Sequence, residues 1–287
     1  MPDTAEPPPS DSAQPALIPL PSVKHVIAVG AGKGGVGKST IAMLAAVGLL
    51  RKGRKAALLD ADVYGPSLPI LTGTQDRQLD LDEQGRVMPA DVGGLKLVSI
   101  GFLVRPDQAV IWRGPMAQKY VKEFLDRTNW GELDYLFVDL PPGTGDIPLT
   151  LAQSIPLTGA VVVCTPQPVA LLDAVRALKM YQKLGVQPLG IVENMSYYVC
   201  PHCGHRDEIF SHGGAKAAAE ALEVPFLGAI PLNIAIREHG DNGKPFANFT
   251  DVDPPVAAAL DDFVTRLEAA ILDQSRRRTP LPQLKVT

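Results

Sequence analysis

The chain has 287 residues, of which 46% are hydrophobic and 20% are charged, a balance typical of globular proteins. Its net charge of −4 argues against the broad basic surface that binds nucleic acid. No apolar run approaches the roughly 18 residues of a membrane-spanning helix, and the N-terminus lacks the apolar core of a signal peptide. We therefore expect a cytoplasmic protein that binds neither nucleic acid nor a membrane.

Short apolar runs alternate with helical patterns along most of the chain. The predicted strands cover residues 26–29, 56–59, 96–103, 135–138, 160–163, 188–192 and 226–230. The predicted helices cover residues 41–50, 116–126, 171–184, 215–222 and 255–272. Apolar strands separated by helices are typical of a parallel sheet that is covered on both faces. The sequence therefore predicts one α/β domain with a mainly parallel β-sheet flanked by helices on both faces.

Changes in composition suggest where this domain begins and ends. Residues 1–24 are rich in proline and predict a disordered leader. Residues 25–272 form the predicted domain, and its polar stretch 75–94 is expected to form a hairpin or a loop. Residues 273–287 are polar and predict a C-terminal tail.

A glycine-rich stretch lies between the first predicted strand and the first predicted helix. It matches the pattern G-x-x-x-x-G-K-[ST], which in this context predicts the phosphate loop of a P-loop NTPase domain. We expect the whole stretch to bind ATP, through Gly32, Lys33, Gly34, Gly35, Val36, Gly37, Lys38, Ser39 and Thr40. In such a loop, backbone N–H groups and the helix N-terminus converge on the phosphates. Lys38 is expected to reach the β- and γ-phosphates, Ser39 to bind Mg²⁺, and Thr40 to lie near the α-phosphate.

Aspartates follow two of the predicted strands. Asp139 directly follows an apolar strand, as in a Walker B motif, and is expected to hold Mg²⁺. Asp62 is our candidate for orienting or deprotonating the attacking water, and Asp60 could assist it or bind the metal. A lone Asp at a strand end is often a helix cap or a turn residue, but two such positions beside a P-loop favour catalysis. The Gly- and Pro-rich segment 140–146 resembles a switch loop.

Two further strand ends suggest an adenine pocket. Asn194 follows one strand and could hydrogen-bond to a purine edge, while Pro231 follows another and could pack against its face. Ordinary turn residues at both positions are a serious alternative.

The three cysteines are too few for a disulfide framework. Cys164 lies in an apolar run and is interpreted as a core residue. Cys200 and Cys203 form a C-x-x-C motif, which could be a redox pair or half of a zinc knuckle completed by nearby histidines. Alternatively, two chains related by a two-fold axis would bring together four thiolates, which suit zinc or an iron–sulfur cluster.

Several motifs occur together in this chain. They cover residues 32–40, 60–67, 112–115, 139–146 and 193–196, the last leading into 200–203. In this combination the sequence resembles the Mrp/ApbC family of iron–sulfur cluster carrier ATPases, which are related to the deviant Walker A proteins MinD, ParA and NifH.

The resemblance implies a homodimer that binds ATP and carries a [4Fe–4S] cluster bridged by Cys200 and Cys203. It also implies slow ATP hydrolysis, with scaffold proteins as cluster donors and apo iron–sulfur proteins as recipients. Lys33 would then cross the interface to the partner's phosphates as a cation acting in trans. A MinD/ParA-like positioning ATPase with a structural zinc is the main alternative, and a NifH-like reductase is a third.

Overall fold

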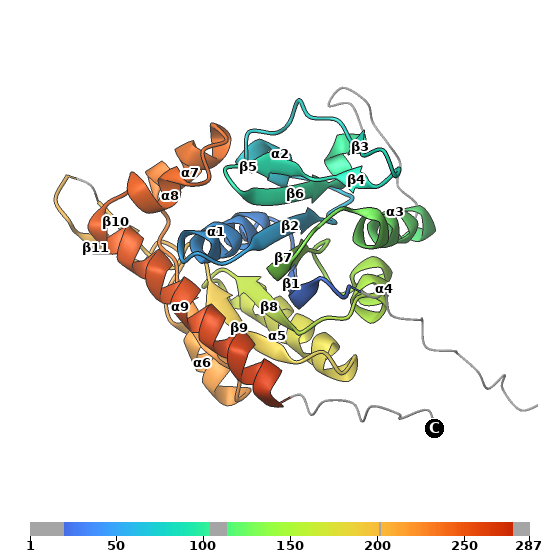
Figure 1. Ribbon diagram of the computed structural model, residues 1–287. Coiled ribbons are helices and arrows are strands. Elements are labelled where there is room, and N and C mark those ends of the chain that lie inside the picture. Colours follow the sequence, from blue (N-terminus) through green and yellow to red (C-terminus); the bar gives the residue numbers. More distant parts are fainter. Residues whose placement is uncertain (1–19, 104–113, 201, 278–287) are drawn as a thin grey trace, which may run out of the picture.

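The computed structural model describes residues 20–103, 114–200 and 202–277 (Figure 1). Its centre is an eight-stranded sheet in the order β12-β9-β8-β1-β7-β2-β6-β5. Every neighbouring pair of strands is parallel except β5 and β6. The strands are β1 (Val23–Ala31), β2 (Ala56–Asp60), β5 (Ala90–Val92), β6 (Leu95–Ser99), β7 (Leu133–Asp139), β8 (Gly159–Cys164), β9 (Pro188–Glu193) and β12 (Phe226–Ala229).

Helices cover both faces of this sheet, as predicted (Figure 1). One face carries α1 (Lys38–Arg51), α2 (Leu68–Leu71), α7 (Ile234–Asp241), α8 (Ala247–Thr250) and α9 (Pro254–Arg277). The other face carries α3 (Gly114–Arg127), α4 (Asp146–Ser154), α5 (Pro168–Lys183) and α6 (Gly214–Ala221). Successive side chains of a strand point to opposite faces, so Ile27 packs under the first group and Ala28 under the second. Because both cores need apolar contacts, the strand is apolar throughout.

Two small hairpins project from the main domain. The first pairs β3 (Asp80–Leu81) with β4 (Val87–Met88), so the polar stretch expected to be a hairpin or a loop contains a hairpin. The second pairs β10 (Tyr198–Val199) with β11 (Arg206–Asp207) and carries the C-x-x-C motif in its turn. The strand predicted over residues 96–103 ends earlier, because its last four residues form the 3₁₀ helix η1 (Ile100–Leu103).

The last helix is longer than predicted. α9 runs to Arg277, five residues into the segment that was expected to be tail. Arg277 pairs with Asp273 one turn earlier, at 2.8 Å, and the basic residues of the last turn favour the negative end of the helix dipole. These local contacts extend the helix beyond its apolar face.

Parts of several predictions fall outside the described residues. These are positions 1–19 of the leader, 278–287 of the tail, and Trp112 and Arg113 of the family motif. Among the helices that are described, none is long and apolar enough to cross a membrane.

Candidate nucleotide site and cysteine hairpin

The glycine-rich loop joins the carboxyl end of β1 to the start of α1, as the motif predicts. Gly35 and Gly37 have φ angles of 78° and 81°, a left-handed backbone conformation that residues other than glycine rarely adopt. Gly37 is the N-cap of α1, so the backbone N–H groups of the first helical turn lie at the loop. The sequence thus folds into an anion-binding loop for reasons of backbone geometry.

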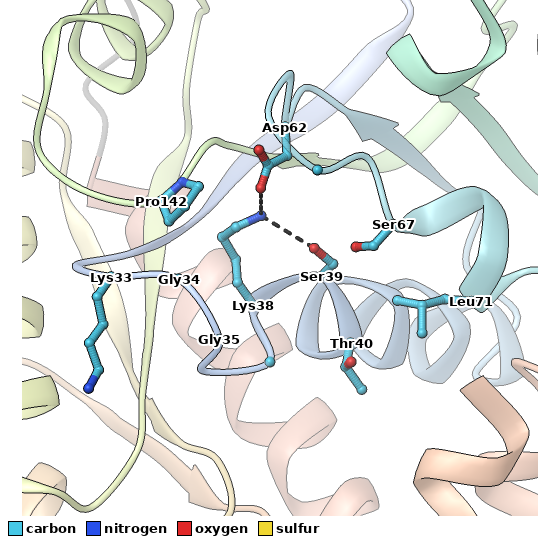
Figure 2. A pocket seen from close by; sticks show the side chains of 12 residues that line it. Lys33, Gly34, Gly35, Lys38, Ser39, Thr40, Asp62, Ser67, Leu71 and Pro142 are labelled. Atoms are coloured by element: carbon cyan, nitrogen blue, oxygen red, sulfur yellow. Dashed lines mark hydrogen bonds and ion pairs between the residues drawn. The ribbon is translucent and has the colours of Figure 1, made fainter. Parts of the chain in front are cut away.

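A cavity of about 280 Å³ opens over this loop (Figure 2). Its walls come from the P-loop, from the segment after β2, from α2 and from the segment after β7. The lining residues are Lys33, Gly34, Gly35, Gly37, Lys38, Ser39, Thr40, Asp62, Gly65, Ser67, Leu71 and Pro142. Strand ends of a parallel sheet meet at one edge, and ligands of such sheets bind there.

Lys38 lies at the centre of the charged groups in this site. Its Nζ is 2.6 Å from Asp139 Oδ1 and 3.3 Å from Asp62 Oδ2, although the side chain is only 7% exposed. Burial lowers the pKa of Lys38, but Asp139 and Asp62 outweigh burial, and the pKa is raised. The lysine is therefore a fixed positive charge in a site that accepts anions.

Hard oxygen ligands for Mg²⁺ lie beside this lysine. Ser39 Oγ donates a hydrogen bond of 2.5 Å to Asp139 Oδ2, so one hydroxyl and one carboxylate are already adjacent. Such oxygens are the ligands that Mg²⁺ uses in phosphate-binding sites. The donor set therefore fits the predicted magnesium ligands Ser39 and Asp139.

Asp60 lies behind the cavity rather than among its lining residues. Its fully buried carboxylate accepts hydrogen bonds from the backbone N–H groups of Asp62 and Leu68, both at 3.2 Å, and from Ser99 Oγ at 3.0 Å. Burial, followed by repulsion from Asp139, raises the pKa of Asp60 to about 8. These contacts fix the segment that carries Asp62.

The side chain of Lys33 extends away from Lys38 and Asp62 (Figure 2). Its ammonium group forms no ion pair or hydrogen bond with the residues that the structure describes. Lys33 therefore presents a positive charge at the rim of the cavity.

Asn194 and Pro231 do not line the cavity, although both lie near the P-loop edge of the sheet. Asn194 Nδ2 donates a 2.9 Å hydrogen bond to the carbonyl oxygen of Val36, and its backbone N–H donates to Cys164. Pro231 is buried after β12. The adenine pocket thus stays a prediction, while the contact of Asn194 with the loop is a finding that the sequence did not suggest.

The cysteine motif forms the tight turn of the β10–β11 hairpin. The backbone N–H of Cys200 donates to the carbonyl oxygen of His205, and the backbone N–H of Gly204 donates to the carbonyl oxygen of Cys200, both at 2.9 Å. Backbone N–H groups of His202 and Cys203, and the thiol of Cys203, donate to the Cys200 sulfur and lower the pKa of Cys200. Cys200 is half-buried and Cys203 is exposed, so a metal or cluster could reach both from outside.

No group of three or more His, Cys, Asp or Glu residues suited to a metal ion occurs within the described part of the chain. Of the three histidines that could complete a zinc knuckle, His202, His205 and His212, the last two have other partners. His205 contacts Asp207 at 3.2 Å, and His212 contacts Ser196 Oγ at 2.8 Å. These contacts do not favour a knuckle that is complete within one chain.

Cys164 behaves as the core residue that the sequence predicted. It is fully buried on β8, and burial raises its pKa to about 12. It is therefore chemically separate from the hairpin cysteines.

A phosphate loop between β1 and α1, with aspartates at the carboxyl ends of the neighbouring strands β2 and β7, defines a P-loop nucleotide-binding domain. Residues 22–268 match the family model described as the NUBPL iron-transfer P-loop NTPase. The chain belongs to this family.

Named relatives of high similarity agree with that assignment. The chain is 52% identical over 241 residues to an iron-sulfur cluster carrier protein of Synechocystis, a match covering 83% of this chain and 68% of the relative. It is 50% identical over 223 residues to a protein of the same name from Escherichia coli, covering 78% and 60%. The Dictyostelium discoideum iron-sulfur cluster transfer protein NUBPL is 45% identical over 247 residues, covering 86% and 76%. The chain thus spans only 60% of the length of the E. coli relative.

Solved structures share the fold. A nucleotide-binding protein from Archaeoglobus fulgidus, in complex with ADP, has a TM-score of 0.71 at 39% identity and covers 78% of this chain and 88% of its own. The cell division ATPase MinD of Pyrococcus furiosus has a TM-score of 0.62 at 22% identity, covering 86% and 99%. The second likeness is one of fold alone.

Proposed function

We propose that this chain is an ATP-hydrolysing carrier of iron–sulfur clusters in the cytoplasm. Two copies would hold one [4Fe–4S] cluster between their cysteine hairpins, receive it from a scaffold protein and deliver it to apo iron–sulfur proteins. The observation that carries this proposal is a surface hairpin with two accessible thiols on a P-loop domain. The names of the relatives support the choice of cargo.

A homodimer follows from the number of ligands. A [4Fe–4S] cluster is held by four thiolates, and one hairpin offers Cys200 and Cys203. A two-fold axis passing beside the hairpin would complete the set with the same residues of a second copy. The hydrogen bonds that lower the pKa of Cys200 favour the thiolate form that binds iron.

The nucleotide chemistry uses the groups around Lys38. The backbone of the P-loop and Thr40 would cradle the phosphates, and Lys38 would exchange its carboxylate partners for the β- and γ-phosphate oxygens. Ser39 and Asp139 would hold Mg²⁺, which neutralises phosphate charge when it is bound. Asp62 lines the same cavity and would orient or deprotonate the attacking water.

Two residues assist from outside this centre. Lys33 would reach the phosphates of the second copy, because its side chain extends away from its own Lys38. Asp60 would act mainly by fixing the Asp62 segment through its backbone hydrogen bonds, with direct contact to the metal as its less favoured role.

Anaerobic reconstitution with iron and sulfide tests the proposal. The wild-type protein should gain the visible absorbance of an iron–sulfur cluster, with about four irons per two chains. It should then restore the activity of an apo [4Fe–4S] enzyme faster than free iron and sulfide do. Cys200→Ser and Cys203→Ser should each lose the cluster, while the control Cys164→Ser keeps it. A full cluster in either hairpin variant would refute the bridging site.

A further inference from the structure

A short segment after β9 lies between the P-loop and the cysteine hairpin. On the P-loop side, Asn194 Nδ2 donates to the carbonyl oxygen of Val36 at 2.9 Å. A Cβ atom built on Gly37 would lie only 2.1 Å from the same nitrogen, so the amide packs directly against the loop backbone. Such close packing leaves no room for the loop to move toward Asn194 without displacing it.

The preceding residue, Glu193, holds the other side of this segment. Its fully buried carboxylate accepts hydrogen bonds from Ser196 Oγ at 2.6 Å, from Gly213 N at 3.1 Å and from Ala215 N at 2.9 Å. His212 Nδ1 completes the group, 2.8 Å from Ser196 Oγ and 3.5 Å from Glu193 Oε1. Because the polar atoms of this group are mostly buried and most of them are hydrogen-bonded to one another, the group holds one arrangement rigidly.

Arg206 of β11 connects this group to the hairpin. Its Nη2 lies 3.1 Å from His212 Nε2, and its guanidinium carbon lies 3.8 Å above the ring centre of Tyr197. Arg206 pairs with Val199 in the β10–β11 ladder, and Val199 directly precedes Cys200. A continuous series of contacts therefore runs from the P-loop carbonyl to the residue beside the first cysteine.

We propose that the polar group around Glu193 and His212 couples the P-loop to the cysteine hairpin within one subunit, with His212 and Arg206 as positioning residues. The coupling rests on the proposed function, which assigns nucleotide to the P-loop and the iron–sulfur cluster to the cysteine hairpin. Phosphates compete with Asp62 and Asp139 for Lys38 and attract the loop N–H groups, so binding changes the loop that Asn194 contacts. Glu193 and His212 then transmit the change to Arg206. Thermodynamic linkage requires the effect to be reciprocal, so occupancy of the hairpin also changes nucleotide affinity.

The reactivity of the hairpin thiols measures this coupling without any cluster. Metal-free, reduced protein is treated with a maleimide, with and without Mg²⁺ and ADP or a non-hydrolysable ATP analogue. Cys164 is buried and does not contribute. In the wild type, nucleotide should change the labelling rate by about fivefold or more, the usual range of allosteric coupling. The nucleotide affinity of each variant is measured in parallel by fluorescence anisotropy.

Removing the contact between His212 and Arg206 should abolish the effect of nucleotide on the labelling rate without weakening nucleotide binding. His212→Ala and Arg206→Ala are expected to bind nucleotide as the wild type does, yet to show labelling rates that nucleotide changes by less than about twofold. Arg206 is exposed, so its substitution tests the coupling even if His212→Ala folds poorly. The matched control is His205→Ala, since His205 lies in the same hairpin, its side chain pairs with the exposed Asp207, and the substitution leaves its backbone hydrogen bond with Cys200 in place. It should keep the full effect.

Two results would overturn the coupling alone. One is normal nucleotide binding in the wild type with unchanged labelling, and the other is a full effect in both His212→Ala and Arg206→Ala. A wild-type protein that binds no nucleotide would overturn the proposed function as well.

Discussion

Lys38 stabilises the apoprotein as well as preparing it for phosphate. It neutralises Asp139, whose carboxylate is fully buried, and it contacts Asp62. Removing one partner of a buried ion pair leaves an uncompensated charge, which typically costs about 3–5 kcal/mol. The charge that the P-loop motif assigns to ATP is therefore also a structural requirement.

We accordingly expect Lys38→Met to lose nucleotide affinity and also to lower the free energy of unfolding by about 3 kcal/mol in urea. The loss should shrink as the pH falls, because burial raises the pKa of Asp139 and protonation then removes its charge. The control is Lys33→Met, which removes a lysine at the rim of the cavity that forms no ion pair with the described residues, and it should leave the unfolding midpoint unchanged. Equal stabilities for the two variants would contradict the structural role of Lys38.

Asp62 differs from the two fully buried aspartates, Asp60 and Asp139, because it lines the cavity and its side chain is 10% exposed. Asp62→Ala should bind ATP with near wild-type affinity, whereas its hydrolysis rate should fall by about 100-fold or more, the usual loss for a general base. Lys33→Ala should also bind ATP normally and lose hydrolysis, because we propose that this lysine acts on the phosphates of the second subunit. Phosphate release under saturating ATP measures both, and unchanged hydrolysis in Asp62→Ala would remove it from the mechanism.

The turn of the cysteine hairpin lowers the pKa of Cys200 through backbone N–H donors. In a Cys203→Ser variant, the pH midpoint for alkylation of Cys200 should lie below the value of about 8.5 for an ordinary thiol. Thiolate then forms earlier as the pH rises, so labelling at neutral pH should be faster in the folded protein than in the same variant unfolded in urea. Coincident pH profiles in the two states would show that the turn does not activate the thiol.

At the scale of elements, α1 and α9 pack unusually closely. A Cβ atom on Gly48 of α1 would lie 2.3 Å from Val264 Cγ2 of α9 and 3.2 Å from Phe249. Surface ion pairs flank this contact, including Arg54 with Glu268 at 2.8 Å. Glycine in the middle of α1 is thus a packing requirement, although it disfavours an isolated helix.

Gly48→Ala should therefore destabilise the protein by about 1–3 kcal/mol, because overpacking outweighs the gain of about 1 kcal/mol in helix propensity. Chemical denaturation measures the difference. Adding Val264→Ala removes the clashing methyl groups, so the double variant should be more stable than the sum of the single effects predicts. A stabilised Gly48→Ala protein would show that propensity dominates at this position.

The elements that can be predicted from the sequence are those whose contacts are local in the chain or whose strands show an apolar pattern. The parallel strands of the central sheet are mostly apolar and are predicted from that pattern. The antiparallel edge strand β5 lies in the polar stretch and was not predicted as a strand, and β10 and β11 have two residues each and no periodicity to detect. The P-loop was found because its contacts are local. The bond from Asn194 to Val36 spans 158 positions, and no local pattern predicts such a pair. Likewise, the sequence suggested that Asp60 assists Asp62 or binds the metal, but no local pattern predicts the hydrogen bonds that its carboxylate accepts from Leu68 and Ser99.

At the scale of the whole molecule, the parallel sheet brings the separate motifs to one edge. Asp60 and Asp139 occupy paired positions at the ends of β2 and β7, and β1 and β9 deliver the P-loop and the Glu193 segment to the same side. Each motif is short and lies far from the others in sequence. Their common edge is what would allow nucleotide and an iron–sulfur cluster to influence one another, as we propose.

The central claim is that two chains share one cluster through Cys200 and Cys203. Native mass spectrometry of the anaerobically reconstituted protein tests this claim most directly. We predict a dimer whose mass exceeds that of two chains by one [4Fe–4S] cluster, and Cys203→Ser protein without that added mass. A cluster retained on a single chain, or a dimer carrying only zinc, would contradict it.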